Sequence, residues 1–286
     1  MSPTFSWQDL NHWNIGWPAL LLLAAAGALY VGGVRRVANW PRIRTVSFLT
    51  GLVVTFLATQ SVLGTVDMGY VSAHMIQHLA LIMVAAPLFA AAAPMSLLDQ
   101  ALSPTWLRGR TMGVIFHPLV AFFLYAVFIP LTHLTTLFDF MLRAMWFHHL
   151  EQADFLVVGY LFFRAAFGIE GDKPLHPGLR LVYVMAAVPV DTITGLALSM
   201  SSHISFPTYP SVAPMGTSAA WQLSNIHLGG AIMWIGGDAL MLLACFPIAI
   251  AWVKFENRRT RALDAELDRL DDEAEQRRRV VKQQER

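Results

Sequence analysis

Residues 70–93 read YVSAHMIQHLALIMVAAPLFAAAA and contain no Lys, Arg, Asp or Glu. A helix needs about 20 mostly apolar residues to cross the hydrocarbon core of a bilayer. Transmembrane β-strands are shorter and alternate apolar with polar residues, which this stretch does not do. Six further segments resemble it, namely 17–34, 45–64, 113–132, 146–168, 179–201 and 222–253. The sequence therefore predicts an all-α integral membrane protein with seven transmembrane helices.

The composition of the chain favours the same class. Of the 286 residues, 56% are hydrophobic and 14% are charged, whereas soluble domains carry about 25% charged residues. Residues 1–253 hold ten basic and ten acidic side chains, so they offer no basic face for nucleic acid. The single cysteine, Cys245, excludes a disulfide or a thiolate cluster within the chain.

Basic residues predict the orientation, because they collect in every second loop while the other loops hold only Arg143. Short basic loops stay in the cytoplasm, so we expect a bacterial cytoplasmic (inner) membrane protein with its N-terminus outside and its C-terminus inside. No positive charge precedes the first span, unlike a signal peptide, so we expect that span in the mature protein. The basic loop residues are Arg35, Arg36, Arg42, Arg44, Arg108, Arg110, Lys173, Arg180, Lys254, Arg258, Arg259 and Arg261.

Charge also divides the chain into two parts. We expect a transmembrane domain over residues 1–253 and a charged cytoplasmic helical tail over 254–286, which holds 19 of the 39 charged side chains. In this tail Leu263, Leu267 and Leu270 recur at helical spacing, as in an amphipathic helix. Two interpretations of the tail stay open. It is either a solvated helix without a specific partner or a docking helix, whose partner could be a second copy of the chain.

Histidines gather at the predicted outer ends of spans three to seven. Ionisable residues inside membrane spans are rare and mark functional sites. The pair His74 and His78 has the spacing that places two side chains on one helix face, as two ligands of one metal ion require. We expect His74, His78, His148 and His227 to bind the metal, with His149, His203 and His133 in reserve.

Methionines near the same ends favour copper as the metal. Met75 and Met145 lie beside the histidines, and imidazole together with thioether selects copper, as Cu(I) or Cu(II). Methionine is also a common packing residue, so these two are supporting candidates only.

Three acidic residues fall inside the predicted spans. Glu151 lies one helical turn after His148 and is placed to orient its imidazole. Asp191 and Asp238 lie deeper in spans six and seven. A buried carboxylate needs a partner or a proton, so these two either serve a proton or ion path or hold helices together, and both interpretations stay open.

Three stretches carry a resemblance to a known family: HMIQHLALIMVAAPLFAAAAP at 74–94, FHHLEQADFLVVGYLFF at 147–163 and HLGGAIMWIGGDAL at 227–240. Together they resemble the CtaG family of polytopic bacterial cytochrome c oxidase assembly factors, over roughly residues 60–255. The resemblance implies a membrane-embedded role in maturing a haem–copper oxidase, with copper handling as the chemistry, and the oxidase subunits and membrane lipid as partners. It carries over His74, His78 and His148.

This chain departs from the family pattern at two places. Gln152 stands where family members often have a second histidine, and Asn225 and His227 stand where they often have an Asp-Gln pair. Two interpretations of these departures stay open: a related metal site whose ligands are rearranged, or a family member that has taken on another task.

Other functions are consistent with the same residues. Histidines on facing helices can also ligate a b-type haem, so a haem-binding redox protein is one alternative. A copper or proton transporter using Asp191 and Asp238 is a second, and a purely structural oxidase subunit is a third. The sequence has no nucleophile–base pair, phosphate loop or dinucleotide fingerprint, so we expect a protein that is not an enzyme.

Overall fold

The structure is a computed structural model that describes residues 13, 15–171 and 174–284, with the side chains of 278–282 left out. Lys173, one of the basic loop residues, lies outside the described residues. All regular secondary structure in the described part of the chain is helical, which confirms the all-α prediction.

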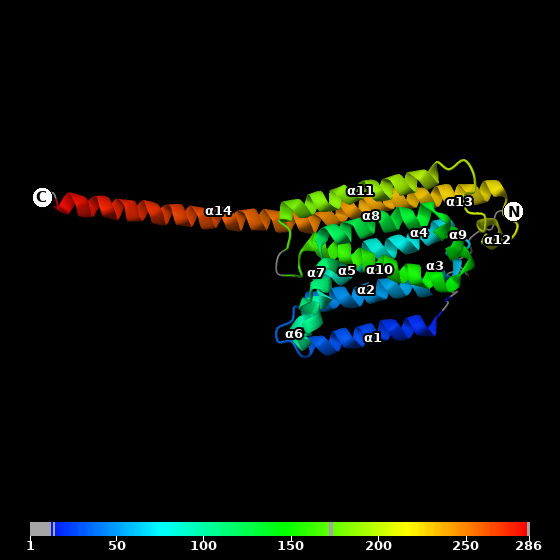
Figure 1. Ribbon diagram of the computed structural model, residues 1–286, viewed down its shortest axis with the longest axis horizontal. Coiled ribbons are helices and arrows are strands. Elements are labelled where there is room, and N and C mark those ends of the chain that lie inside the picture. The colour runs from blue at the N-terminus through cyan, green and yellow to red at the C-terminus, as the bar shows by residue number, and fades with distance from the viewer. Residues whose placement is uncertain (1–12, 14, 172–173, 285–286) are drawn as a thin grey trace.

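The long helices run side by side and form the body of the molecule (Figure 1). They correspond to the seven predicted segments, although two of them contain a π-helical turn. Their bounds are α1 (Trp17–Val34), α2 (Arg42–Gln60), α4 (Val71–Leu79) continuing through η2 (Ala80–Ala85) into α5 (Ala86–Ala92), α8 (Pro118–Leu134), α10 (Met145–Phe167), α11 (Pro177–Ser199), and α13 (Ala219–Ala231) continuing through η4 (Ile232–Gly236) into α14 (Gly237–Gln284).

Short helices connect the long ones at both ends of the body. Their bounds are α3 (Val62–Val66), α6 (Pro94–Leu102), η3 (Thr105–Arg108), α7 (Arg110–Ile115), α9 (Thr136–Arg143) and α12 (Tyr209–Val212). Ala93 adopts a left-handed conformation with φ of 53° between α5 and α6, and Pro94 then opens α6. The third long segment thus ends before Pro94, because a proline cannot continue the preceding helix.

Length and composition identify the membrane-spanning candidates. Among the described residues, five helical segments are long and apolar enough to cross a bilayer, or six if α8 and α9 count as one span with a 67° bend. The helix α10 is 23 residues long but is not among them, and it carries Glu151, Asp154 and Arg164. The protein is a multi-pass membrane protein, while the seventh span and the orientation stay predictions.

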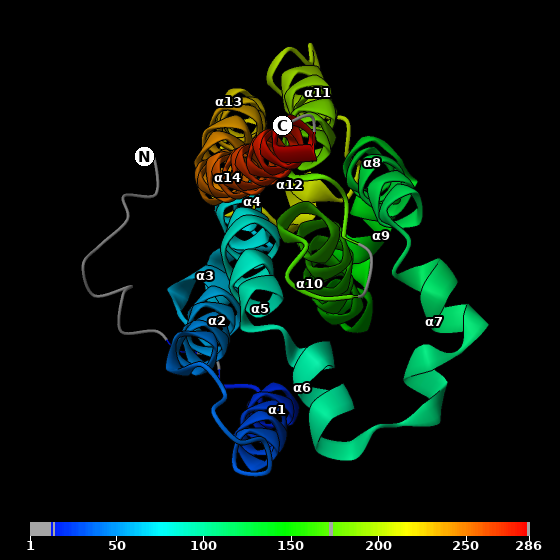
Figure 2. The ribbon, with the colours of Figure 1, turned by 90° about the vertical axis from the view of Figure 1, so that its left-hand side faces the viewer.

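The segment α4–η2–α5 and the helix α10 lie in the middle of the bundle, and α1 lies at its edge (Figure 2). Gly159 of α10 sets their spacing, because a Cβ at this position would lie only 2.8 Å from side-chain atoms of Ile82 and Ala86. Only a glycine allows two helices to approach so closely. This contact brings the polar start of α10 against the polar face of α4.

The helix α14 continues without a break from the body into the charged tail and projects far beyond the other helices (Figure 1). Leu263, Leu267 and Leu270 are each about half exposed there. The apolar stripe of the tail therefore has no packing partner among the described residues.

Candidate metal centre

Four imidazoles and one carboxylate converge inside the bundle. They come from three helices: His74 and His78 from α4, His133 from α8, and His148 and Glu151 from α10. None of the five side chains is more than 3% exposed. We call this group the buried cluster.

The rings of the buried cluster are in mutual contact. The ring centroids of His74 and His78 are 4.0 Å apart, and those of His74 and His148 are 5.2 Å apart. His133 faces His78 at a centroid distance of 5.3 Å. Two sets of three ligand atoms lie within 4.8 Å of one another, namely His74, His78 and His133, and His74, His148 and Glu151.

Glu151 lies at the centre of the buried cluster. Its Oε2 is 3.9 Å from His74 Nε2, 3.8 Å from His78 Nε2 and 3.7 Å from His148 Nδ1. These separations exceed a hydrogen bond but suit a shared ion between the atoms. The sequence predicts only a supporting role for Glu151, whereas the geometry makes it a potential ligand.

Polar atoms of the buried cluster lack hydrogen-bond partners among the described residues. Both ring nitrogens of His74 and of His78, Nε2 of His133, Nδ1 of His148 and Oε2 of Glu151 are all in this state. Each unsatisfied buried group costs about 1–3 kcal/mol, and native proteins contain few of them. Seven in one place indicate a site built for a ligand that supplies the missing contacts.

Neighbouring groups orient two of the imidazoles. His133 Nδ1 lies 2.9 Å from the carbonyl oxygen of Ile129. A carbonyl only accepts, so Nδ1 carries the proton and Nε2 presents its lone pair. His148 Nε2 lies 2.9 Å from Asp67 Oδ2, which leaves its Nδ1 facing Glu151. A carboxylate–histidine pair of this kind is the usual support of a metal-binding imidazole.

Asp67 is a site residue that the sequence analysis did not single out. Besides His148, it accepts hydrogen bonds from Gln77 Nε2 at 2.7 Å and from its neighbour Met68 N at 2.8 Å. Gln152, at the position where the family often has histidine, packs on the same side with its Nε2 2.8 Å from His148 Nε2. The sequence held one signal for this role: Asp67 is an acidic residue that lies just before the polar start of the third predicted span.

Three predicted histidine ligands lie elsewhere in the structure. His227 is partly buried, and its Nε2 lies 2.8 Å from the carbonyl oxygen of Ser201. His149 and His203 are exposed. His133, expected only in reserve, takes the place expected for His227 because α8 ends against α4 rather than at the surface.

The two methionines that the sequence gives as supporting candidates lie in different surroundings. Met75 is buried in the apolar core, and Met145 is 52% exposed. The ligand atoms of the buried cluster itself are imidazole nitrogens and a carboxylate oxygen.

Aromatic rings close the buried cluster towards the loops. Phe155 stacks on His78 at a centroid distance of 3.9 Å, and Phe138 of α9 lies 5.2 Å from His74. Phe206, in the loop after α11, packs on Phe138 at 4.2 Å. The 67° bend between α8 and α9 folds Phe138 over the site.

A set of polar contacts, which we call the polar latch, joins Asp139 and Arg143 to Thr208 and holds α9 in this position. Asp139 accepts hydrogen bonds from the backbone N–H of Thr208 at 2.6 Å and from its hydroxyl at 3.0 Å. Arg143 pairs with Asp139 and also donates to the Thr208 hydroxyl. These contacts join α9 to the loop after α11.

The two deep aspartates form a separate polar group. Asp191, 2% exposed, accepts a hydrogen bond from the Tyr125 hydroxyl at 2.6 Å. Asp238 accepts from the Thr192 hydroxyl at 2.9 Å. Each has a partner on another long helix, so these bonds are consistent with helix pairing, and the ion-path interpretation stays a prediction.

Comparison with known proteins places the chain among relatives. The profile of the cytochrome c oxidase caa3 assembly factors (Caa3_CtaG) matches residues 28–254. An uncharacterized protein of Mycobacterium leprae is 31% identical over 267 residues, covering 85% of this chain and 39% of that protein. Uncharacterized proteins of Mycobacterium bovis and Mycobacterium tuberculosis are each 30% identical over 284 residues, covering 89% of this chain and 42% of theirs.

This chain therefore spans about two fifths of the length of these curated relatives. No solved structure matches it. The family profile, in contrast, covers most of the chain, including all five residues of the buried cluster. The resemblance seen in three motifs is thereby confirmed, and the chain belongs to the family of cytochrome c oxidase caa3 assembly factors.

Proposed function

We propose that this protein assists the assembly of a haem–copper cytochrome c oxidase by holding a copper ion in the buried cluster and passing it on. Membership of the assembly-factor family supports the assembly role. The observation that carries the metal role is that seven buried polar atoms of the buried cluster have no partner among the described residues. A cation bound there would take one ring nitrogen from each histidine that reaches it, together with an oxygen of Glu151.

The ligand chemistry narrows the choice of metal. Imidazole and carboxylate ligands suit copper, zinc and iron, while magnesium and calcium prefer oxygen ligands alone. The oxidase family connection favours copper among the first three. Because sulfur is absent from the described cluster, imidazole nitrogens would carry Cu(I) or Cu(II), with Glu151 adding a negative charge.

Imidazole ligands make the site suited to delivery rather than permanent storage. Thiolates hold copper tightly, but the chain has one cysteine, Cys245, which lies partly buried on α14. Four imidazoles in mutual contact offer more nitrogens than one ion needs, so a leaving ion can exchange ligands stepwise. We infer that oxidase subunits receive the ion at the end of the bundle where α9 lies.

The geometry favours the copper interpretation over the haem alternative. A porphyrin needs a flat slot between two axial imidazoles, whereas the four imidazoles here touch one another, Phe155 and Phe138. The transporter alternative depends on Asp191 and Asp238, which already bond to Tyr125 and Thr192. We therefore propose a non-enzymatic copper-binding role.

Metal analysis of the full chain tests the proposal. We expect about one copper per chain after anaerobic Cu(I) loading in detergent, with no haem band in the visible spectrum. A His74→Ala, His78→Ala variant should lose the copper, and a His133→Ala variant should bind it more weakly. The control is His149→Ala, which removes an exposed imidazole next to His148 and should leave the copper content unchanged.

Two results would refute the proposal. One is a His149→Ala variant that loses as much copper as the double variant, since copper would then bind surface imidazoles. The other is a wild-type chain that stays free of copper after loading while its melting curve shows a folded protein. X-ray absorption on the loaded protein should show nitrogen or oxygen neighbours and no sulfur.

A further inference from the structure

A second site candidate lies at the opposite end of the bundle from the buried cluster. A hollow of about 480 Å³ opens there between the η3–α7 arm, the start of α8, the end of α10 and the loop after α10. Arg164, in its wall, follows His148 on the same helix by 16 residues, or about 24 Å along the axis. The hollow therefore shares no residue with the buried cluster.

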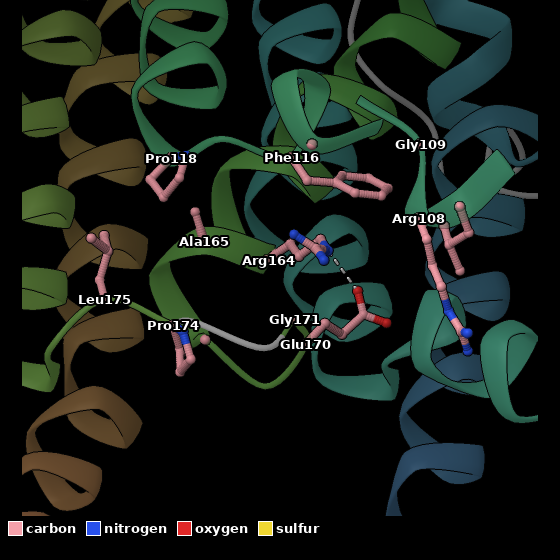
Figure 3. Close-up of a pocket in the computed structure, with 13 residues that line it drawn as sticks. Arg108, Gly109, Phe116, Pro118, Arg164, Ala165, Glu170, Gly171, Pro174 and Leu175 are labelled. Carbon is pink, nitrogen blue, oxygen red and sulfur yellow. Dashed lines mark hydrogen bonds and ion pairs between the residues drawn. The ribbon is translucent and has the colours of Figure 1, made fainter. Parts of the chain in front are cut away.

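Arg164 is the main polar group of this hollow. Its guanidinium lies over the Phe116 ring at 4.0 Å, and its Nε donates to Glu170 Oε2 at 3.0 Å. Figure 3 shows it between these two side chains. The two terminal nitrogens of Arg164 have no hydrogen-bond partner among the described residues, although the side chain is only 12% exposed. An arginine held this way keeps donors free for an anion.

The carboxylate in the wall pairs with Arg164 through Nε, which leaves the two terminal nitrogens of the guanidinium for a ligand. Glu170 already accepts four hydrogen bonds, from Met95 N at 2.8 Å, Ser96 N at 3.0 Å, the Tyr160 hydroxyl at 2.6 Å and Arg164 Nε. Its charge thus fixes the loop to α6 and α10. The second arginine of the wall, Arg108, is 68% exposed and bonds only to Asp99 among the described residues.

A glycine keeps the space beside Arg164 open. Gly171 has a φ of 91°, and a Cβ there would meet Arg164 Nη2 at 3.4 Å. Gly168, with a φ of 55°, turns the chain at the end of α10, and a Cβ there would collide with the guanidinium of Arg180. The left-handed conformation favours glycine at both positions, and the missing side chain of Gly171 leaves room for a ligand beside Arg164.

We propose that this hollow binds a phosphate group, with an anionic phospholipid as its source. The arginines of the hollow lie at the end of the bundle that carries the basic loops, where the phosphates of membrane lipids would lie. Basic pockets between transmembrane helices are known to bind anionic headgroups. An apolar groove of about 710 Å³ is lined by α1, α2, α5, α6 and α10. Two of its residues, Met95 and Tyr160, donate hydrogen bonds to Glu170 in the wall of the hollow. The groove fits the acyl chains of the lipid whose phosphate contacts Arg164.

Native mass spectrometry of the full chain in detergent tests the proposal. We expect the protein to retain phosphatidylglycerol about tenfold more strongly than phosphatidylcholine with the same acyl chains, because two arginines prefer a net anion. Arg108→Gln and Arg164→Gln should each weaken phosphatidylglycerol binding about tenfold. The matched control, Arg110→Gln, removes an exposed arginine of the same arm that does not line the hollow and should bind like the wild type.

The outcomes separate the sources of the phosphate. Equal retention of the two lipids, or equal losses in the Arg108 and Arg110 variants, would overturn the site and leave an adventitious annular lipid only. If glycerol 3-phosphate alone binds as tightly as the lipid, the lipid source is overturned and a soluble phosphate compound replaces it. Because Arg164→Gln also removes a bond to Glu170, the exposed Arg108 variant decides the result if Arg164→Gln melts early.

Discussion

Replacing Asp67 by asparagine should weaken metal binding although Asp67 is not itself among the proposed ligands. In the structure Asp67 Oδ1 accepts from Met68 N, while Oδ2 accepts from both Gln77 Nε2 and His148 Nε2. An amide has one oxygen and one NH₂ group, so at least one of these three donors loses its acceptor whichever way the asparagine turns.

The tautomer of His148 determines the size of the effect. With Asp67 present, the proton stays on Nε2 and the lone pair of Nδ1 faces Glu151, 3.7 Å away. Gln152 Nε2 also lies 2.8 Å from His148 Nε2, so the Asp67 carboxylate is the group that holds the proton there. With an asparagine NH₂ turned to Nε2, two amide donors face this nitrogen and favour the other tautomer, whose Nδ1 carries a proton and cannot bind a metal. Removal of such a supporting carboxylate typically lowers metal affinity about 10–100-fold, which is ~1.4–2.8 kcal/mol.

A Cu(I) competition titration against a chelator measures this change on the detergent-solubilised full chain. Asp99→Asn is the control, because it makes the same substitution in an exposed ion pair with Arg108 at the other end of the bundle. We expect wild-type affinity for that control and a 10–100-fold loss for Asp67→Asn. If Asp67→Asn binds copper as tightly as the control while His74→Ala, His78→Ala does not, the proposed role of Asp67 is refuted.

Three further changes test the packing around the sites. Gly159→Ala places a Cβ against Ile82 and Ala86 and should destabilise the protein by about 1–3 kcal/mol through overpacking. The melting temperature should therefore fall, and an unchanged melting temperature contradicts the close approach of α10 to these residues. Thr208→Ala removes the hydroxyl that bonds to Asp139 and should speed copper release several-fold in stopped-flow chelation with little change in affinity; equal release rates contradict the latch. Tyr125→Phe leaves Asp191 without its donor and should cost about 1–3 kcal/mol in melting experiments while copper content stays constant; a loss of copper would link the two polar groups.

The positions of the long helices followed from hydropathy because an uninterrupted apolar run has few other stable states in a membrane. The pairing of His74 with His78 followed from helix geometry alone, since four residues make about one turn. The close fit of α10 against η2 and α5 is a tertiary contact that no local pattern predicts. Gly159 allows that contact, but its neighbours Ile82 and Ala86 lie more than 70 residues earlier in the chain.

The depth of a candidate ligand depends on tertiary bends that the sequence does not reveal. The sequence places both His133 and His227 near the ends of predicted spans. In the structure the chain bends by 67° after α8, so α9 covers His133, whereas His227 bonds to the Ser201 carbonyl. The contacts that hold this bend join Asp139 to Thr208, 69 residues away. No local pattern contains that information.

The burial of the cluster bears on how an ion enters and leaves. Its side chains are at most 3% exposed, so a role in delivery requires part of the wall to move. The wall formed by α10 and the segment α4–η2–α5 is not a suitable exit, because Gly159 packs directly against Ile82 of η2 and Ala86 of α5. The wall formed by α9 is different: a sharp bend precedes it, and Asp139 and Arg143 fasten it to Thr208. Polar bonds of this kind can exchange with water or with a partner protein, so α9 is the part of the wall through which an ion can pass.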